Sequence, residues 1–276
     1  MSRDPGHGNA SFSAATYNVL APAYIHPAWY PRTSSLVLNP AWRIPALVGH
    51  VASFGDDIIC LQEVELEVFS ALRMRLGELG YGSQYARKRA GKVDGCATFY
   101  RQGLFELVDA NIILYADGHG AEADSGNIAL VAVLRSNAGS IGVINTHLTW
   151  DPPEAALEAR LGYRQVSQLL RDYKGMESEM RSWVIAGDFN ATPESSTIAL
   201  LGSAGLDFAH RHLPGVYTCN ANARAQMIDY LFYSAALRAE PLPLPRVDDR
   251  TALPSAEHPS DHVPVRAKFH WKAQAS

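Results

Sequence analysis

The chain has 276 residues and a mass of 30.1 kDa, long enough to bury a large hydrophobic core. A formal net charge of -4 and a pI near 6.2 argue against a protein that coats long nucleic acids without sequence preference. The 47% hydrophobic and 19% charged residues are ordinary for a globular protein, and no run approaches the roughly 18 apolar residues of a membrane helix.

The N-terminal residues and the cysteines indicate the compartment. The start, MSRDPGHGNASFS, is polar and lacks the apolar segment of a secretory signal, so we expect residues 1–10 to be a short flexible lead-in. The cysteines, Cys60, Cys96 and Cys219, are odd in number, widely spaced and in no metal-type pairing. They indicate small buried side chains in a reducing compartment. We predict a cytoplasmic protein with no membrane association, a monomer whose sequence indicates no protein partner.

Short apolar runs typical of β-strands recur along the whole chain. Several are almost continuously apolar, which predicts strands that are covered on both faces. In chain order the runs are ATYNVL (15–20), DIICLQ (57–62), ATFYR (97–101), LFELVDANIILY (104–115), NIALVAVL (127–134), SIGVINTHL (140–148), SWVIAGDF (182–189), IDYLFYS (228–234) and VPVRAKFHW (263–271).

Three helical patterns lie between these runs. PAWRIPALVGHVASF (40–54) is apolar at three-to-four spacing, and ELEVFSALRMRLGELG (65–80) runs from acids to basic residues before a terminal glycine. PPEAALEARLGYRQVSQLLRDY (152–173) begins with prolines and acids and continues as an amphipathic pattern. The order of strands and helices predicts an α/β (α+β) fold with two mixed β-sheets packed between helices. For the Pro-rich stretch 239–260 we expect a long surface loop near the functional site.

Polar residues repeatedly stand where the apolar runs end. A sheet holds side chains rigidly at its strand ends, so ligands gather there. Asp229 lies inside the apolar run MIDYLFY, where a buried carboxylate needs a partner. The polar positions at or near the ends of the runs are Asn18, Gln62, Glu63, Asn145, His147, Asp188, Asn190, Asp229, Asp261 and His262.

These residue types predict a metal-dependent phosphate site. Carboxylate and amide oxygens suit a hard Mg²⁺ ion, with Mn²⁺ as the alternative, and no Cys-His cluster in the sequence indicates zinc. Histidines can hold or protonate phosphate oxygens. Each position also has a structural alternative when it is taken singly: Asn18 as a turn cap, Glu63 as an acid in the first turn of a helix, and the Asp188–Asn190 segment as a turn. The recurrence of such positions in one chain favours the metal site.

A basic segment, ARKRAGK (86–92), places four cations in seven residues. It is either a solvated loop or a loop that steers phosphate toward the site. In the second interpretation Arg89 is a candidate substrate-binding residue.

The motifs YNVL, LQEVE, NTHL, GDFNATP, IDYLFYS and PSDHVPV, in this order, resemble those of the endonuclease/exonuclease/phosphatase superfamily of Mg²⁺-dependent phosphodiesterases. VDGCATFYR (93–101) and THLTWDP (146–152) resemble its deadenylase branch, which includes nocturnin, the Angel proteins and the 2′,5′-phosphodiesterase. Leu20 stands where the repair endonucleases of the superfamily carry an acid. The resemblance implies a four-layer α/β sandwich, formed as a single catalytic domain over residues 11–271.

The resemblance also implies a metal site and the reaction it serves. Glu63 is then the main Mg²⁺ ligand, Asn18 lies in the metal and phosphate shell, and Asp261 completes the metal side. The implied reaction is in-line attack of water on phosphorus, in which the metal and the imidazoles neutralise the growing negative charge.

The resemblance assigns the remaining strand-end residues to water and phosphate. Asp188 orients or deprotonates the attacking water, and Asn190 holds that water or the phosphate. His147 and His262 contact phosphate oxygens, and Asp229 pairs with His262.

The substrate is the part of the resemblance that this sequence leaves open. Poly(A) nucleases of the superfamily carry an aromatic residue that stacks on adenine shortly before the IDY aspartate, whereas here the matching position is Arg224. Trp150 and Pro152 could line a nucleotide pocket, although a helix-entry turn explains Pro152 equally well.

We predict an enzyme that hydrolyses phosphate esters of RNA or of a nucleotide, with 3′→5′ exoribonuclease activity as the first candidate. A phosphatase or phosphodiesterase for nucleotides or 2′,3′-cyclic phosphates is the alternative. A DNA repair endonuclease is disfavoured by Leu20. An inactive binding module is disfavoured because every expected catalytic position is filled.

Overall fold

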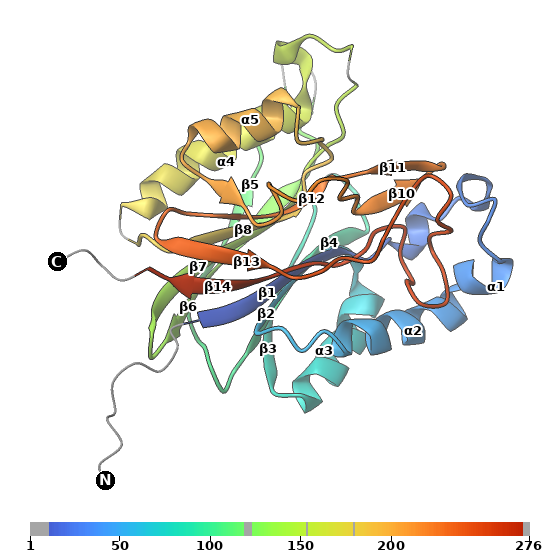
Figure 1. The fold of residues 1–276 in the computed structure, drawn as a ribbon, viewed down its shortest axis with the longest axis horizontal. Coiled ribbons are helices and arrows are strands. Elements are labelled where there is room, and N and C mark those ends of the chain that lie inside the picture. Colours follow the sequence, from blue (N-terminus) through green and yellow to red (C-terminus); the bar gives the residue numbers. More distant parts are fainter. Residues whose placement is uncertain (1–10, 119–122, 153, 179, 273–276) are drawn as a thin grey trace.

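Two six-stranded sheets pack face to face, with helices on both outer faces (Figure 1). The computed structural model describes residues 11–118, 123–152, 154–178 and 180–272, so the lead-in predicted over residues 1–10 lies outside the described residues. The sequence of layers is helices, sheet, sheet, helices, and the α/β sandwich predicted from the sequence is confirmed.

The first sheet contains the first and the last strand of the chain. In order across the sheet, its strands are β13 (Leu237–Pro241), β14 (Val265–Trp271), β1 (Ser11–Asn18), β2 (Ile58–Glu65), β4 (Asp94–Arg101) and β3 (Tyr81–Arg87). Only the central pair, β1 and β2, is parallel; the other neighbours are antiparallel. As a consequence the carboxyl ends of β1 and β2 lie at the same rim of the sheet.

The second sheet has the same mixed character. In order, its strands are β5 (Glu106–Leu114), β6 (Ile128–Ser136), β7 (Gly139–His147), β8 (Trp183–Asp188), β12 (Asp229–Tyr233) and β9 (Asp207–Phe208). Here β7 and β8 form the parallel pair. A separate two-stranded ribbon is formed by β10 (Cys219–Ala221) and β11 (Arg224–Gln226).

The helices cover the outer face of each sheet. Next to the first sheet lie α1 (Ser35–Leu38), α2 (Pro40–Ala52) and α3 (Leu66–Glu78); next to the second lie α4 (Leu161–Glu177) and α5 (Ser196–Ser203). Short 3-10 helices are η1 (Pro22–Tyr24), η2 (Pro27–Trp29) and η3 (Leu157–Ala159). Asn39 caps α2 through its side-chain oxygen and Ser195 caps α5 in the same way.

The helix predicted to start at residue 152 begins nine residues later, at Leu161. The reason is a cap from outside the helix: the Asp151 carboxylate accepts hydrogen bonds from the amides of Gly162 and Tyr163. These two amides belong to the first turn, where no backbone carbonyl can accept them. Pro152, Glu154 and Glu158 of the predicted start therefore lie in the connection that precedes α4.

An apolar layer fills the space between the two sheets. Phe12 of β1 and Phe269 of β14 stack with their ring centroids 5.4 Å apart, and Leu134, Val143 and Leu231 meet them from the second sheet. Each fully buried side chain of this size stabilises the fold by about 1.5–3 kcal/mol. The layer thus fixes the distance between the sheets, and with it the geometry of any site that takes residues from both.

A buried amide pair connects the sheets close to the rim. Gln62 of β2 donates a hydrogen bond of 2.8 Å to the side-chain oxygen of Asn145 in β7, and Asn145 donates 2.9 Å to the carbonyl of Ala97 in β4. Both side chains are fully buried. These two strand-end polar residues therefore hold the sheets in register.

The stretch 239–260 is a loop only in part, because β13 extends to Pro241. Its remainder is pinned to the first sheet's side of the molecule, where Arg32 and Thr33 donate hydrogen bonds to the carbonyls of Asp249 and Pro254. The loop leads directly to Asp261, one of the candidate site residues, so it lies near the predicted site.

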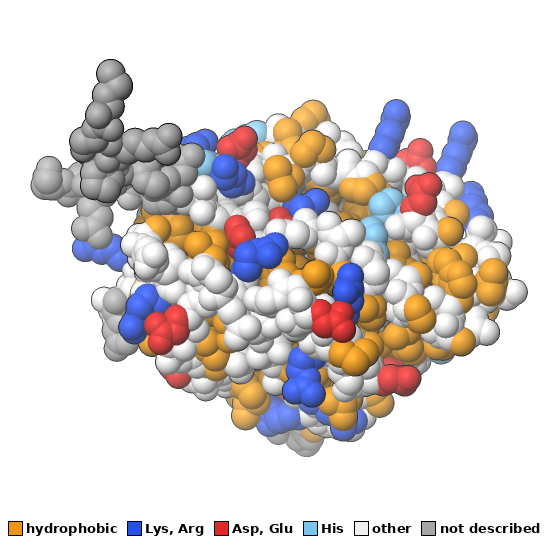
Figure 2. Space-filling model, turned by 90° about the horizontal axis from the view of Figure 1, so that it is seen from below, with side chains coloured by type: hydrophobic (Ala, Val, Ile, Leu, Met, Phe, Trp, Pro, Cys, Tyr) orange, Lys and Arg blue, Asp and Glu red, His pale blue; other side chains and the backbone are white. Residues whose placement is uncertain are grey.

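Charge is mixed over the face of the described residues drawn in Figure 2, where basic and acidic side chains alternate with hydrophobic ones instead of gathering into one basic patch. None of the described helices combines the length and the apolar character that crossing a membrane requires.

Candidate active site

The strands of the second sheet bring three of the predicted residues side by side. His147 is the last residue of β7 and lies opposite Asp188, the last residue of β8. Asp229, the first residue of the antiparallel β12, lies opposite Asp188 on its other side. The adjacent strands therefore place an imidazole and two carboxylates in one row at the rim.

The first sheet contributes Asn18 and Glu63 from its parallel pair. The register of β2 shifts between Leu61 and Val64, and Glu63 within this bulge has a φ of +58°, a left-handed conformation that is costly for a residue with a side chain. Asn18 donates 2.9 Å hydrogen bonds to Glu63 Oε1 and to Asp188 Oδ2. One amide therefore connects the carboxylates of the two sheets.

Asp188 occupies the centre of the site. Its Oδ2 lies 3.6 Å from Nε2 of His147 and 3.8 Å from Nε2 of His262, and its Oδ1 accepts a 2.9 Å hydrogen bond from the amide of Asn190. Burial, and after it the negative charge of Asp229, raises the pKa of the Asp188 carboxyl to about 7. Such a carboxyl is suited to exchange a proton near neutral pH.

His262 is held by a buried carboxylate. Its Nδ1 lies 2.8 Å from Oδ2 of Asp229, an oxygen that also accepts a 2.6 Å hydrogen bond from Thr218. Burial by itself would lower the pKa of His262, but the Asp229 carboxylate outweighs burial and holds this pKa well above 6.5. His262 is therefore an imidazolium whose Nε2–H points into the site.

His147 has a cationic neighbour that the sequence analysis missed. Nζ of the buried Lys88 lies 3.1 Å from Nδ1 of His147 and 2.6 Å from Oδ2 of Asp94, and Tyr24 donates a 2.7 Å hydrogen bond to the other Asp94 oxygen. Burial, and after it the charge of Lys88, lowers the pKa of His147 well below 6.5. His147 is therefore a neutral imidazole.

A hydrogen-bond donor faces each of the two nitrogens of this neutral ring, although the ring has one acceptor nitrogen. The Lys88 ammonium faces Nδ1, and the side-chain amide nitrogen of Asn190 lies 3.1 Å from Nε2 while it also donates to the carbonyl of Leu148. A neutral imidazole has one acceptor nitrogen and one donor nitrogen, so one of the two contacts sets donor against donor. An anionic oxygen beside His147 and Asn190 would relieve this contact, which makes this corner of the site suited to phosphate.

The predicted metal ligands lie on the side of the first sheet. Glu63 Oε2 accepts a 2.9 Å hydrogen bond from the amide of Ala21, and Asp261 Oδ2 accepts one of 2.9 Å from Tyr30. Burial, and after it the charge of Asp261, raises the pKa of Glu63. The oxygen donors of Glu63 and Asp261 fit a hard divalent cation.

Among the described residues, two groups of side chains have ligand atoms within 4.8 Å of one another and could hold a metal ion. One consists of Asp188, Asp229 and His262, and the other of Cys219, Asp261 and His262. All five residues are buried. The site thus has acidic clusters of the kind that binds metal.

The four predicted substrate-binding residues stand outside this cluster. Trp150 is 57% exposed and follows His147 by three residues, with the half-buried Pro152 beyond it. The exposed Arg89 donates a hydrogen bond to the carbonyl of Tyr115. Arg224 is exposed and lines a cavity of about 420 Å³. None of the four belongs to the cluster of buried site residues.

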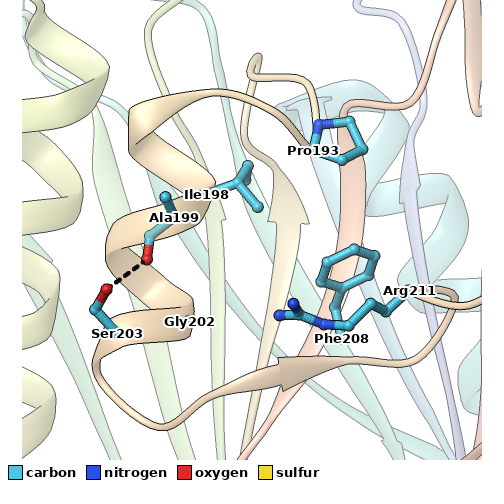
Figure 3. A pocket seen from close by; sticks show the side chains of 7 residues that line it. All are labelled: Pro193, Ile198, Ala199, Gly202, Ser203, Phe208 and Arg211. Atoms are coloured by element: carbon cyan, nitrogen blue, oxygen red, sulfur yellow. Dashed lines mark hydrogen bonds between the residues drawn. The ribbon is translucent and has the colours of Figure 1, made fainter.

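The cavity beside Arg224 begins next to the site. Its wall includes Thr192, two residues after Asn190, together with Tyr217 and Gln226. A second cavity of about 530 Å³ lies beyond Pro193, between α5 and β9, where Ile198 and Phe208 face each other and the Arg211 guanidinium lies 4.8 Å from the Phe208 ring (Figure 3). None of the residues predicted for catalysis lines this second cavity.

Comparison with known proteins gives a family and several relatives. A sequence model of the Endonuclease/Exonuclease/phosphatase family matches residues 15–262. The chain is 28% identical to the CCR4-Not complex 3'-5'-exoribonuclease subunit Ccr4 of Candida albicans and 27% identical to protein angel homolog 2 of Mus musculus, over 95% and 79% of its length. It spans only 41% of the length of each of these relatives.

The fold has solved counterparts. The crystal structure of ANGEL2, a 2',3'-cyclic phosphatase, in complex with adenosine-2',3'-vanadate superimposes with a TM-score of 0.82 at 24% identity, covering 96% of this chain and 97% of that one. The resemblance and the sandwich fold predicted from the motifs are confirmed by these matches.

Proposed function

The chain belongs to the endonuclease/exonuclease/phosphatase family, and from this membership we propose that it is a metal-dependent hydrolase of phosphate esters in nucleic acids or nucleotides. The observation that supports this best is the position of Asp188, whose Oδ2 lies within 3.8 Å of the Nε2 atoms of both His147 and His262. A carboxylate that faces two imidazoles at a rim is arranged to direct water at an anion held by those imidazoles.

The two histidines bind the phosphate as donors. His262 is positively charged because Asp229 holds its pKa well above 6.5, and it presents Nε2–H to the anion. His147 accepts a hydrogen bond from Lys88 at Nδ1, so its proton lies on Nε2. Both N–H groups are fixed before the substrate arrives and can stabilise charge that develops on the phosphate oxygens.

Asp188 acts on the nucleophile. Its raised pKa makes the carboxylate a stronger base than an exposed aspartate, so it can take a proton from the attacking water. The amide of Asn190 fixes Oδ1 and the side chain of Asn18 fixes Oδ2, which limits the rotation of the carboxylate. Asp188 therefore stands between the two imidazoles that we propose to hold the phosphate.

Glu63 would hold the metal, and Asp261 and Asn18 would supply further oxygen ligands on the same side. We propose Mg²⁺, with Mn²⁺ as a substitute, because hard carboxylate and amide oxygens form the donor set. When bound, this ion polarises the phosphoryl group and neutralises its charge. Asn18 links Glu63 to Asp188, so the metal ligand and the base keep a constant separation.

We propose RNA 3′ ends as the first substrate class and 3′→5′ exoribonuclease activity as the reaction. The Ccr4 relatives, named as 3'-5'-exoribonuclease subunits, support this class. Arg224 in place of an adenine-stacking aromatic weakens any preference for poly(A). A second candidate is hydrolysis of 2′,3′-cyclic phosphates, supported by the angel relative together with the ANGEL2 fold match.

A substrate panel tests the proposal. The purified protein is incubated with 5′-labelled oligo(A), mixed RNA, RNA with a 2′,3′-cyclic phosphate, abasic DNA and NADPH, each with Mg²⁺ or with EDTA. We expect ladders on RNA or loss of the cyclic phosphate, in Mg²⁺ only. Asp188→Asn should lower kcat by about 10²–10⁴-fold, whereas Asp109→Asn, an exposed acid in β5, should not. Metal-independent turnover, or full activity of Asp188→Asn, contradicts the mechanism.

A further inference from the structure

A cysteine lies beside the candidate phosphate-binding histidine. Cys219 opens β10 and forms an isolated antiparallel bridge with His262. Backbone hydrogen bonds of 2.9 Å from Asn220 to Asp261 and of 2.7 Å from Val263 to Thr218 fix this pairing on both sides. The sulfur of Cys219 lies within 4.8 Å of a ring nitrogen of His262. The backbone therefore holds Cys219, Asp261 and His262 together as a rigid group.

These three side chains form a mixed donor set. A thiol sulfur, an imidazole nitrogen and a carboxylate oxygen lie within 4.8 Å of one another, and each residue is at most 6% exposed. Sulfur and nitrogen ligands bind Zn²⁺ strongly, whereas Mg²⁺ takes oxygen ligands. Zn–S and Zn–N bonds of ~2.3 and ~2.0 Å require the group to contract by roughly 1 Å. The set is therefore suited to a softer metal than the Mg²⁺ proposed for Glu63.

Neighbouring residues orient the donors. Asp229 engages Nδ1 of His262, which leaves Nε2 as the free nitrogen, 4.0 Å from Oδ1 of Asp261. Tyr30 engages the other oxygen of Asp261. A histidine whose second nitrogen is bound by a carboxylate is the usual arrangement in zinc sites. Among the described residues, the other two thiols, Cys60 and Cys96, belong to no such group.

We propose that Cys219, Asp261 and His262 form an inhibitory site for a thiophilic divalent cation, Zn²⁺. On binding, the thiol releases its proton to solvent and its sulfur bonds to the metal, while Nε2 of His262 exchanges its proton for the metal. His262 can then no longer donate Nε2–H to a phosphate. This site shares Asp261 with the proposed Mg²⁺ site, and its binding is measured without activity; the inhibition rests on the proposed function.

Binding is tested without any substrate. Cd²⁺, a spectroscopic probe for thiolate sites, is titrated into wild type, Cys219→Ser and Cys60→Ala/Cys96→Ala, with Mg²⁺ present. We expect the ultraviolet thiolate-to-Cd²⁺ charge-transfer band at one equivalent in wild type and in the double variant, and its loss in Cys219→Ser. If the double variant does not fold, the two single variants replace it. A band that persists in Cys219→Ser, or no band in wild type, overturns the site.

Inhibition is tested by activity at saturating Mg²⁺. Cys219→Ser should keep the basal kcat, because Cys219 has no part in the reaction, and should need at least ~10-fold more Zn²⁺ for half-inhibition. Equal sensitivity of wild type and Cys219→Ser overturns the inhibitory role. If no substrate of the panel is turned over but the Cd²⁺ band depends on Cys219, the proposed function fails and the metal site stands.

Discussion

Lys88 is the site residue that the sequence analysis missed, although it lies in the basic segment 86–92. The segment 86–92 contains four cations, and nothing in their number indicates which one turns inward. The alternation of a strand does indicate it: Ala86 and Lys88 are buried while Arg87 and Arg89 are exposed. If the alternation of β3 (Tyr81–Arg87) is extended by one residue, it predicts that Lys88 is the cation that points inward. What period-two reasoning could not supply is its partner, since His147 comes from the other sheet.

Replacing Lys88 separates a positioning role from a structural one. Lys88→Met leaves the buried Asp94 unpaired and should lower the free energy of unfolding by about 3–5 kcal/mol. Lys88→Met/Asp94→Asn removes both charges and should recover most of that stability, as measured by urea unfolding.

The double variant should remain at least ~10-fold lower in kcat because His147 has lost the donor at Nδ1. Nitrogen-15 NMR of the His147 ring checks the cause, since the proton should no longer be fixed on Nε2. Full activity in the double variant, with the ring spectrum of wild type, would show that Lys88 only stabilises the fold.

Arg224 is a single residue on which base preference depends. In Arg224→Phe an aromatic ring returns to the position that stacks on adenine in the poly(A) nucleases, next to the cavity lined by Thr192 and Tyr217. Stacking on a base contributes ~1–3 kcal/mol, so we expect the ratio of kcat/KM on oligo(A) over oligo(U) to rise by ~5-fold or more. Arg238→Phe, an exposed arginine in β13, serves as the matched control. An unchanged ratio would place the base elsewhere.

At the scale of elements, the sequence predicted strands better than it predicted the ends of helices. The apolar runs locate both ends of β7, β8 and β12 to within one residue, whereas β1 begins four residues before its predicted run and β2 ends three residues after it. The start of α4 was wrong because prolines and acids are also typical of a loop before a cap. Only the position of Asp151, eleven residues before Gly162, identifies the true start, and this contact is not local in sequence.

Asp151→Ala tests this cap. The carboxylate accepts hydrogen bonds from the amides of Gly162 and Tyr163, and both donors lose their partner in the variant. We expect the free energy of unfolding to fall by about 1–2 kcal/mol in a denaturant titration. Asp172→Ala removes an exposed acid from the same helix and should change it by less than about 0.5 kcal/mol. Equal losses in both variants would exclude a specific cap.

At the scale of the whole molecule, the order of the motifs predicts more about the structure than the hydrophobic periodicity does. Alternating strands and helices predict layers, but they do not say that β8 is paired with β12, which starts 41 residues after β8 ends, and this pairing places Asp229 opposite Asp188. The resemblance supplied the pairing of Asp229 with His262, but not this pairing of strands. The resemblance could not supply the cluster of Cys219 with His262, because this cluster depends on a cysteine outside the shared motifs. The single domain, the monomeric state and the cytoplasmic location stay predictions.

The stability of the whole fold should respond to acid through histidines that are buried uncharged. His50 packs against Tyr17, Phe54 and His258, and burial, followed by the charges of His258 and Arg266, lowers its pKa to about 4. The unfolded chain, with a pKa near 6.5, then binds more protons than the folded one between about pH 6.5 and 4. The contribution of His50 is therefore complete above pH 6.5 and is lost as the pH falls through this window.

His50→Phe keeps the ring packing and removes the titration. Measured by denaturant titration at intervals from pH 8 to pH 4, the difference in free energy of unfolding between variant and wild type should be constant above about pH 7. Toward pH 4 this difference should shift in favour of the variant by on the order of 1–2 kcal/mol. The shift is smaller than a fully buried ring would give, because His50 is only half-buried. Carboxyls with raised pKa, such as Glu63, act in the opposite direction in both proteins and cancel in the difference. Parallel curves for the two proteins over the whole range would mean that His50 is not held uncharged by the fold.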